Sequence, residues 1–165
     1  MQMPRAVRDD DRDDDGMTPK RLFTIVAIGE AITWTLLLLG MFLKYVTRST
    51  EVMVSIGGGV HGFMFLAYCV ATVFVGVSQQ WGIRAILLGL GSAIIPYATI
   101  PFEIGARRRG LLDGAWGLAA GGREPKTLLE RPIAWGIRKP VSALLTGVLA
   151  VAVVFTVLLI LGPPV

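Results

Sequence analysis

Four long apolar segments divide the chain, and each is long enough to cross a membrane as a helix. They run over Leu22–Leu43, within Val52–Gln80, over about Ile83–Phe102 and over Val141–Leu161. A helix of about 20 apolar residues covers the roughly 30 Å hydrocarbon core of a bilayer. The pattern therefore predicts an all-α, polytopic membrane protein with four transmembrane helices.

Glycine and proline interrupt the second and third segments. Gly57, Gly58 and Gly59 stand near the start of the second segment, and Gly62 completes a GxxxG pair with Gly58. This spacing lets two membrane helices approach closely, so Gly57, Gly58 and Gly62 are the expected helix-packing residues. Pro96 lies inside the third segment and removes a backbone hydrogen bond, which predicts a kinked or loosened helix there.

Charge divides the chain further. Six of the 12 acids lie between Asp9 and Asp15, and eight of the 16 bases lie between Arg107 and Lys139. We expect a disordered acidic tail over 1–20, a three-span core over 21–106, a basic glycine-rich loop over 107–140 and a fourth helix over 141–165. The bases flank apolar spans, so they indicate membrane topology and no nucleic-acid partner is expected.

The distribution of bases also predicts an orientation. With four spans, the loop containing Lys44 and Arg48 lies on the same side as the basic loop, which gives ten bases against six on the opposite side. Cytoplasmic loops carry the excess of Lys and Arg. The sequence therefore predicts a plasma-membrane protein with residues 107–140 in the cytoplasm and both termini outside.

Enzyme signatures are absent from the sequence. It has one cysteine, Cys69, and no GxxxxGK[ST], GxSxG or HExxH motif. We therefore expect no enzyme, no catalytic residue, no metal and no cofactor.

Polar residues recur at helical spacing on each of the first three spans. The candidates are Glu30 and Lys44 on the first, His61 and Tyr68 on the second, and Ser92, Pro96 and Glu103 on the third. An ionisable side chain that faces lipid costs about 3 kcal/mol, so these stripes should face one another. They predict a three-helix bundle with a polar core, outside which the fourth helix packs.

Counting residues from the two expected turns places His61 level with Glu103, and Glu30 about five residues deeper. Two interpretations of these residues stay open. In one, they form interhelical hydrogen bonds that hold the helices in register. In the other, Glu30, His61 and Glu103 form a cluster that takes up protons or binds a cation; one His and two carboxylates could also bind a transition metal, although no motif supports it.

Several sequence stretches in this order resemble the bacterial domain-of-unknown-function 3817 membrane family. They are AIGEAITWTLLLL in the first span, MFLKY at Met41–Tyr45, GGGVHGFMFLAY at Gly57–Tyr68 and SAIIPYATIPFE at Ser92–Glu103. The resemblance covers about residues 20–108, and it departs from the family at Ala31, where many relatives have glycine. It implies the membrane architecture and marks Glu30, Lys44, His61, Pro96 and Glu103 as motif positions, but the family has no established activity.

The expected function is that of a small, non-enzymatic membrane protein. Three or four short helices hardly enclose a pathway alone, so the expected partners are the lipid bilayer and either further copies of the chain or another membrane protein. The chain is then a homo-oligomer or an accessory subunit of a membrane complex. The alternative is a proton- or ion-linked carrier or channel for small solutes, built on the Glu30, His61 and Glu103 cluster.

Overall fold

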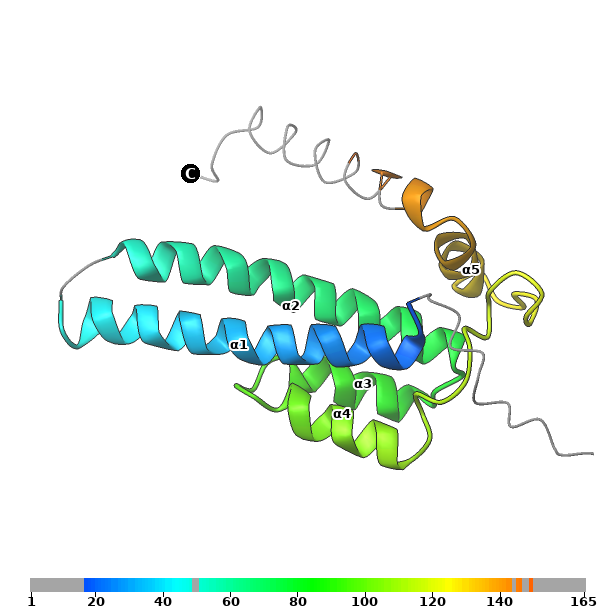
Figure 1. Cartoon of the computed structure of the whole chain (residues 1–165), viewed down its shortest axis with the longest axis horizontal. Coiled ribbons are helices and arrows are strands. Elements are labelled where there is room, and N and C mark those ends of the chain that lie inside the picture. The colour runs from blue at the N-terminus through cyan, green and yellow to red at the C-terminus, as the bar shows by residue number, and fades with distance from the viewer. Residues whose placement is uncertain (1–16, 49–50, 144, 147–148, 150–165) are drawn as a thin grey trace, which may run out of the picture.

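Every regular secondary-structure element in the described part of the chain is a helix (Figure 1). A computed structural model describes residues 17–48, 51–143, 145–146 and 149. The helices are α1 (Pro19–Tyr45), α2 (Val52–Ser78), α3 (Ile83–Ser92), α4 (Thr99–Arg108) and α5 (Glu130–Arg138), and no strand occurs among these residues. Most of the predicted acidic tail and most of the predicted fourth span lie outside the described residues.

Helices α1 and α2 form a long antiparallel pair and match the first two predicted spans as candidate membrane helices. Thr18 caps α1 by accepting a hydrogen bond from the Arg21 N–H at 3.2 Å, and Pro19 occupies the first turn, where no N–H is needed. Each helix has 27 residues, about 40 Å in length. They are the two helices of the described chain that are long and apolar enough to cross a membrane.

The outward faces of this pair are those of helices in lipid. Large apolar side chains are exposed along both helices: Ile25, Ile28, Ile32, Leu36, Leu39 and Phe42 on α1, and Val52, Ile56, Val60, Phe63, Leu66 and Val70 on α2. The core helix of a soluble protein would bury such residues, because apolar surface is stabilised by removal from water. The exposed faces therefore favour a membrane environment.

Two glycines allow α1 and α2 to touch backbone to backbone. A Cβ on Gly40 would stand 2.8 Å from the Met53 oxygen, and a Cβ on Gly57 would stand 3.0 Å from the Leu36 oxygen. Gly57 is thus a helix-packing residue, as predicted. Gly58 and Gly62 make no such approach within the described chain, because an added Cβ would meet only a side-chain carbon at 3.9 Å at Gly58 and nothing within 4 Å at Gly62.

The third predicted span is not one continuous helix. It divides into α3 and α4, each of ten residues and about 15 Å long, which is half the hydrocarbon thickness. Trp81 Nε1, just before α3, donates to the Leu111 carbonyl, just after α4, at 2.6 Å. The two helices therefore form a re-entrant hairpin that enters and leaves at the same end of the molecule, alongside the α1–α2 pair (Figure 1).

The reversal occurs where Pro96 predicts an interruption, but it is much larger than a kink. Proline disfavours the helical conformation in the residue before it. The residue after Pro96, Tyr97, also leaves the helical conformation, with a left-handed φ of +64°. The Thr99 hydroxyl then donates to the Ala27 carbonyl at 3.1 Å, which fixes the first turn of α4 against α1. On the other limb, Gly89 brings α3 close to Thr72 of α2.

Because the hairpin returns, most of the segments that connect the helices lie at one end of the molecule. Trp116 Nε1 donates to the Met17 carbonyl at 2.6 Å, and Gln79 Nε2 donates to the Ala115 carbonyl at 3.0 Å. The beginning of α1, the 79–82 link and the basic loop thus lie together, at what is called the basic end below. The predicted placement of the amino-terminal side and the basic loop on opposite faces is wrong, since it assumed a third crossing.

Two clusters of buried apolar residues hold these elements together. The first joins α1, α2 and the hairpin through the rings of Phe23, Tyr68, Trp81 and Phe102, whose contacting pairs have centroids 5.5–6.0 Å apart. The second packs Leu118, Ile133 and Ala134 against Phe74 and Val77 of α2. It attaches α5 and the basic loop to the basic end of α2.

Candidate functional site

The buried Glu and His side chains of α1, α2 and the hairpin lie in two groups. The central polar group consists of Glu30, Thr33 and Trp34 on α1 and His61 on α2. The second group lies at the basic end, where Glu103 of α4 contacts α1. In one of the two interpretations that the sequence leaves open, Glu30, His61 and Glu103 form a single cluster, and the separation of these two groups bears directly on that interpretation.

His61 is held against α1. Its side chain is buried, its Nδ1 lies 3.2 Å from Thr33 Oγ1, and its ring centroid lies 4.4 Å from that of Trp34. The Thr33 hydroxyl donates its only proton to the Glu30 carbonyl at 3.0 Å. The Thr33 hydroxyl therefore links the backbone of α1 to the His61 ring of α2.

Glu30 is fully buried, one helical turn before Trp34. Neither oxygen of its carboxyl group has a hydrogen-bond partner in the described chain, and neither does Trp34 Nε1. Burying a polar group without a partner costs free energy, so such groups are uncommon in folded proteins. Glu30 and Trp34 are therefore the residues of the central polar group whose polar atoms lack a hydrogen-bond partner in the described chain.

Glu103 lies away from the central polar group, so the predicted pairing of Glu103 with His61 is wrong. Its Oε1 accepts a hydrogen bond from Thr24 Oγ1 at 2.6 Å and lies 3.5 Å from Arg107 Nη1. Thr24 and Thr33 are nine residues apart on α1, about 13 Å along the axis. The prediction failed because it counted along a straight third helix, whereas the hairpin carries Glu103 back to the basic end.

The remaining predicted residues occupy separate places. The Tyr68 hydroxyl lies 2.9 Å from Ser92 Oγ, and Ser92 donates to the Gly89 carbonyl at 2.6 Å, so this pair joins α2 to the end of α3. Pro96 lies exposed in the hairpin turn. Lys44 is at the far end of α1, where its Nζ lies 3.5 Å from Glu51 Oε1. Neither Pro96 nor Lys44 belongs to the central polar group.

The basic loop contains an ordered ion pair that sequence reasoning missed. Arg123 Nη1 donates to Glu130 Oε1 at 2.5 Å, and the backbone N–H groups of Lys126 and Thr127 donate to Glu130 Oε2. The Arg123 hydrogen bond, followed by the Lys126 N–H, holds the pKa of Glu130 down to about 2. Thr127 and Glu130 have the three-residue spacing of a capping box, and this signal could have revealed the start of α5.

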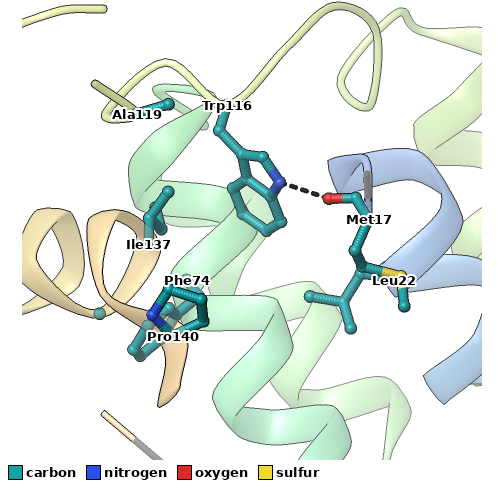
Figure 2. A pocket seen from close by; sticks show the side chains of 8 residues that line it. Met17, Leu22, Phe74, Trp116, Ala119, Ile137 and Pro140 are labelled. Atoms are coloured by element: carbon teal, nitrogen blue, oxygen red, sulfur yellow. Dashed lines mark hydrogen bonds between the residues drawn. The ribbon is translucent and has the colours of Figure 1, made fainter. Parts of the chain in front are cut away.

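An apolar pocket of about 440 Å³ opens beside this loop at the basic end. Figure 2 shows Leu22, Phe74, Ile137 and Pro140 on its walls and the Trp116 indole donating to the Met17 carbonyl at its edge. The pocket has almost no polar lining and no titratable side chain, so it offers no group for a reaction. The described residues also contain no set of three or more His, Cys, Asp or Glu that could hold a metal ion.

Two long helices with lipid-facing side chains and a re-entrant hairpin define an integral membrane protein. The chain belongs to the family described as Domain of unknown function (DUF3817), which matches residues 20–108. It is 46% identical to a Streptomyces coelicolor protein named "Putative membrane protein SCO5905" over 93 residues, which make up 56% of this chain and 11% of that protein. No solved structure matches the chain.

Proposed function

We propose that this chain is a non-enzymatic protein of the plasma membrane that works as a homo-oligomer or as an accessory subunit of a membrane complex. The observation that carries this proposal is the tip of the re-entrant hairpin, residues 93–98. One limb of the hairpin is about 15 Å long, so its tip reaches the middle of a 30 Å hydrocarbon core.

Most of the tip is uncovered in the single chain, although Ala93 is buried and the Tyr97 hydroxyl lies 3.3 Å from Thr35 Oγ1 of α1. Ile94 is 69% exposed, Ile95 61% and Tyr97 44%. The turn forms some backbone hydrogen bonds, but the N–H groups of Ile95 and Tyr97 have no acceptor among the described residues. Irregular backbone does not face lipid at this depth, where no water can replace a missing partner; it is found buried in protein or lining a water-filled cavity.

Protein is the better cover for this tip. Ile94 and Ile95 are apolar and would gain nothing from a water-filled cavity, whereas a neighbouring helix can bury them and supply acceptors. The long Streptomyces relative supports the same view. The region it shares with this chain is joined to a much larger remainder, so a related unit occurs in covalent association with other protein.

Photo-crosslinking at the tip tests the proposal. A photoreactive phenylalanine analogue would replace Ile95 and, as a matched control, Leu88, which is equally exposed but lies on the regular helix α3. In native membranes we expect the probe at position 95 to form a protein adduct and the probe at 88 to react mainly with lipid. An adduct of two copies supports the homo-oligomer, and a stoichiometric second protein supports the accessory role.

Failure of this proposal would also be plain. The proposal fails if the probe at position 95 reacts only with lipid and subunit counting in bilayers finds one copy of the chain per particle. The tip would then need no protein cover. The argument from the hairpin would then be refuted.

The arrangement of charges supports an orientation with the basic end in the cytoplasm. Among the described residues, Lys44 and Arg48 are the only bases at the end where α1 connects to α2, and the other eleven bases belong to segments that start or end at the basic end. This imbalance is far larger than the one expected for four spans. After replacement of Cys69, a cysteine at Gln80 should resist an impermeant thiol reagent in intact cells, and one at Val46 should react. The reverse pattern would overturn the orientation.

Glu30 favours a second candidate function, the proton- or ion-linked transport of a small solute. A buried carboxyl group without a partner is a default candidate for ion or proton handling in a membrane helix. The test is ion and proton flux in proteoliposomes. The carrier proposal expects a flux that Glu30→Gln abolishes and Glu103→Gln leaves intact, because Glu103 lies outside the central polar group. Equal flux in the wild type and in Glu30→Gln would exclude it.

A further inference from the structure

A second open pocket lies at the basic end, between the first turns of α1 and the last turn of α4. Its volume is about 530 Å³, and it is lined by Thr18, Lys20, Arg21, Thr24, Ile25 and Arg107. It therefore brings together three cations from two helices, Lys20 and Arg21 of α1 and Arg107 of α4. None of these residues belongs to the central polar group.

The charges of this pocket are not balanced within the described chain. Lys20 and Arg21 form no ion pair with a described carboxylate, and the first turn of α1 contains no acid. Glu103 is the nearby carboxylate, and it is already engaged by the Thr24 hydroxyl and by Arg107. The pocket thus keeps an excess of two positive charges, to which the positive end of the α1 dipole adds.

Apolar surface continues from the pocket toward the middle of the membrane. Ile25, at the pocket edge, is followed on the same face of α1 by Ile28 and Ile32, and all three are 47–57% exposed. The spacing of three and four residues aligns them in a strip along the helix axis. A ligand with a negatively charged head and an apolar tail would match both parts, with its head in the pocket and its tail along the strip.

We propose that this pocket binds the phosphate of an anionic phospholipid, with Lys20, Arg21 and Arg107 as the ligating cations. Clusters of Lys and Arg beside a membrane helix are typical of anionic-headgroup recognition, in which each base strengthens binding about five-fold. The isoleucine strip favours a lipid over a soluble phosphate, since a free anion would make no use of it. This inference depends on the fold alone and holds for either proposed function.

The test uses the full chain in a nonionic detergent, titrated with short-chain phosphatidylglycerol and followed by native mass spectrometry. The double variant Lys20→Gln/Arg21→Gln should bind about 25-fold more weakly than the wild type. The matched control is Arg108→Gln/Arg109→Gln, which removes two exposed charges from the same end without touching the pocket lining. Phosphatidylcholine, whose headgroup has no net charge, should bind weakly to all three proteins.

The other possible outcomes distinguish a specific lipid site from a soluble-anion site and from general attraction to the basic end. Equal weakening in the test and control variants would overturn the proposal, because it would show attraction to the whole basic end and no specific site. Displacement of phosphatidylglycerol by millimolar inorganic phosphate, lost in Lys20→Gln/Arg21→Gln, would keep the phosphate site but assign it to a soluble anion. Absence of displacement, together with the selective loss in the test variant, would establish the lipid as the ligand.

Discussion

Gly40→Ala is the substitution that most directly tests the contact between the two spanning helices. The new methyl group would stand 2.8 Å from the Met53 oxygen and from Val54 N and Cα. Carbon atoms in contact normally lie 3.5–4.0 Å apart. All three neighbours are backbone atoms that cannot rotate away, so the helices must separate by about 0.7–1.2 Å.

That separation sets the size of the effect. A gap of this width forfeits a quarter to a half of the attraction of each contact along the crossing, and overpacking of tight contacts costs about 1–3 kcal/mol. Alanine also improves helix propensity by about 0.5–1 kcal/mol over glycine. We therefore expect Gly40→Ala to lower the free energy of unfolding by about 1–2 kcal/mol.

Gly62→Ala is the matched control, because its added methyl group would meet nothing within 4 Å in the described chain. It keeps the gain in propensity without the clash, and so should be neutral or slightly stabilising. Both variants can be compared in mixed micelles by SDS titration followed with circular dichroism. If Gly40→Ala is as stable as Gly62→Ala within about 0.5 kcal/mol, the helices do not cross at Gly40.

Two further predictions concern the basic end. Trp81→Phe keeps an aromatic ring but removes the donor to the Leu111 carbonyl. It should lower the free energy of unfolding by about 1 kcal/mol in the same titration and expose residues 110–114 to protease. Unchanged proteolysis would show that this bond does not close the hairpin. Glu130 has its pKa lowered from an ordinary 4.5 to about 2, so its stabilisation of the loop is complete above about pH 4.5 and is lost as the pH falls toward 2. Protease resistance of the loop should fall over that range, and Glu130→Gln should remove the pH dependence; Glu124→Gln, at a carboxylate that is 82% exposed, should retain it.

The long helices could be predicted from the sequence because hydrophobic length alone defines them. Leu22–Leu43 lies within α1, and the range Val52–Gln80 ends two residues beyond α2. The third segment shows the limit of this signal. An apolar run of about 20 residues has the same composition whether it continues across the membrane or turns back at its middle. Pro96 marks the interruption, but the direction after it depends on contacts such as that between Thr99 and Ala27.

For the candidate site, the sequence could predict which residues are buried but not which residues pair with one another. The burial of Glu30 and His61 follows from polar residues inside apolar helices, and the structure agrees. The pairing of His61 with Glu103 depended on the path of the chain between them, so it failed with the third span. The partner of His61 is Thr33, a nearer residue on α1, which belongs to the same polar stripe as Glu30.

The return of the hairpin also determines whether the family region crosses the bilayer an even or an odd number of times. Residues 20–108 begin and end at the same face, since Met17 contacts Trp116 and Trp81 contacts Leu111. A unit that crosses the bilayer an even number of times leaves the orientation of any segment joined before or after it unchanged. It can therefore be inserted between, or appended to, other membrane helices as a cassette without inverting them, whereas a three-span unit would reverse every helix that follows.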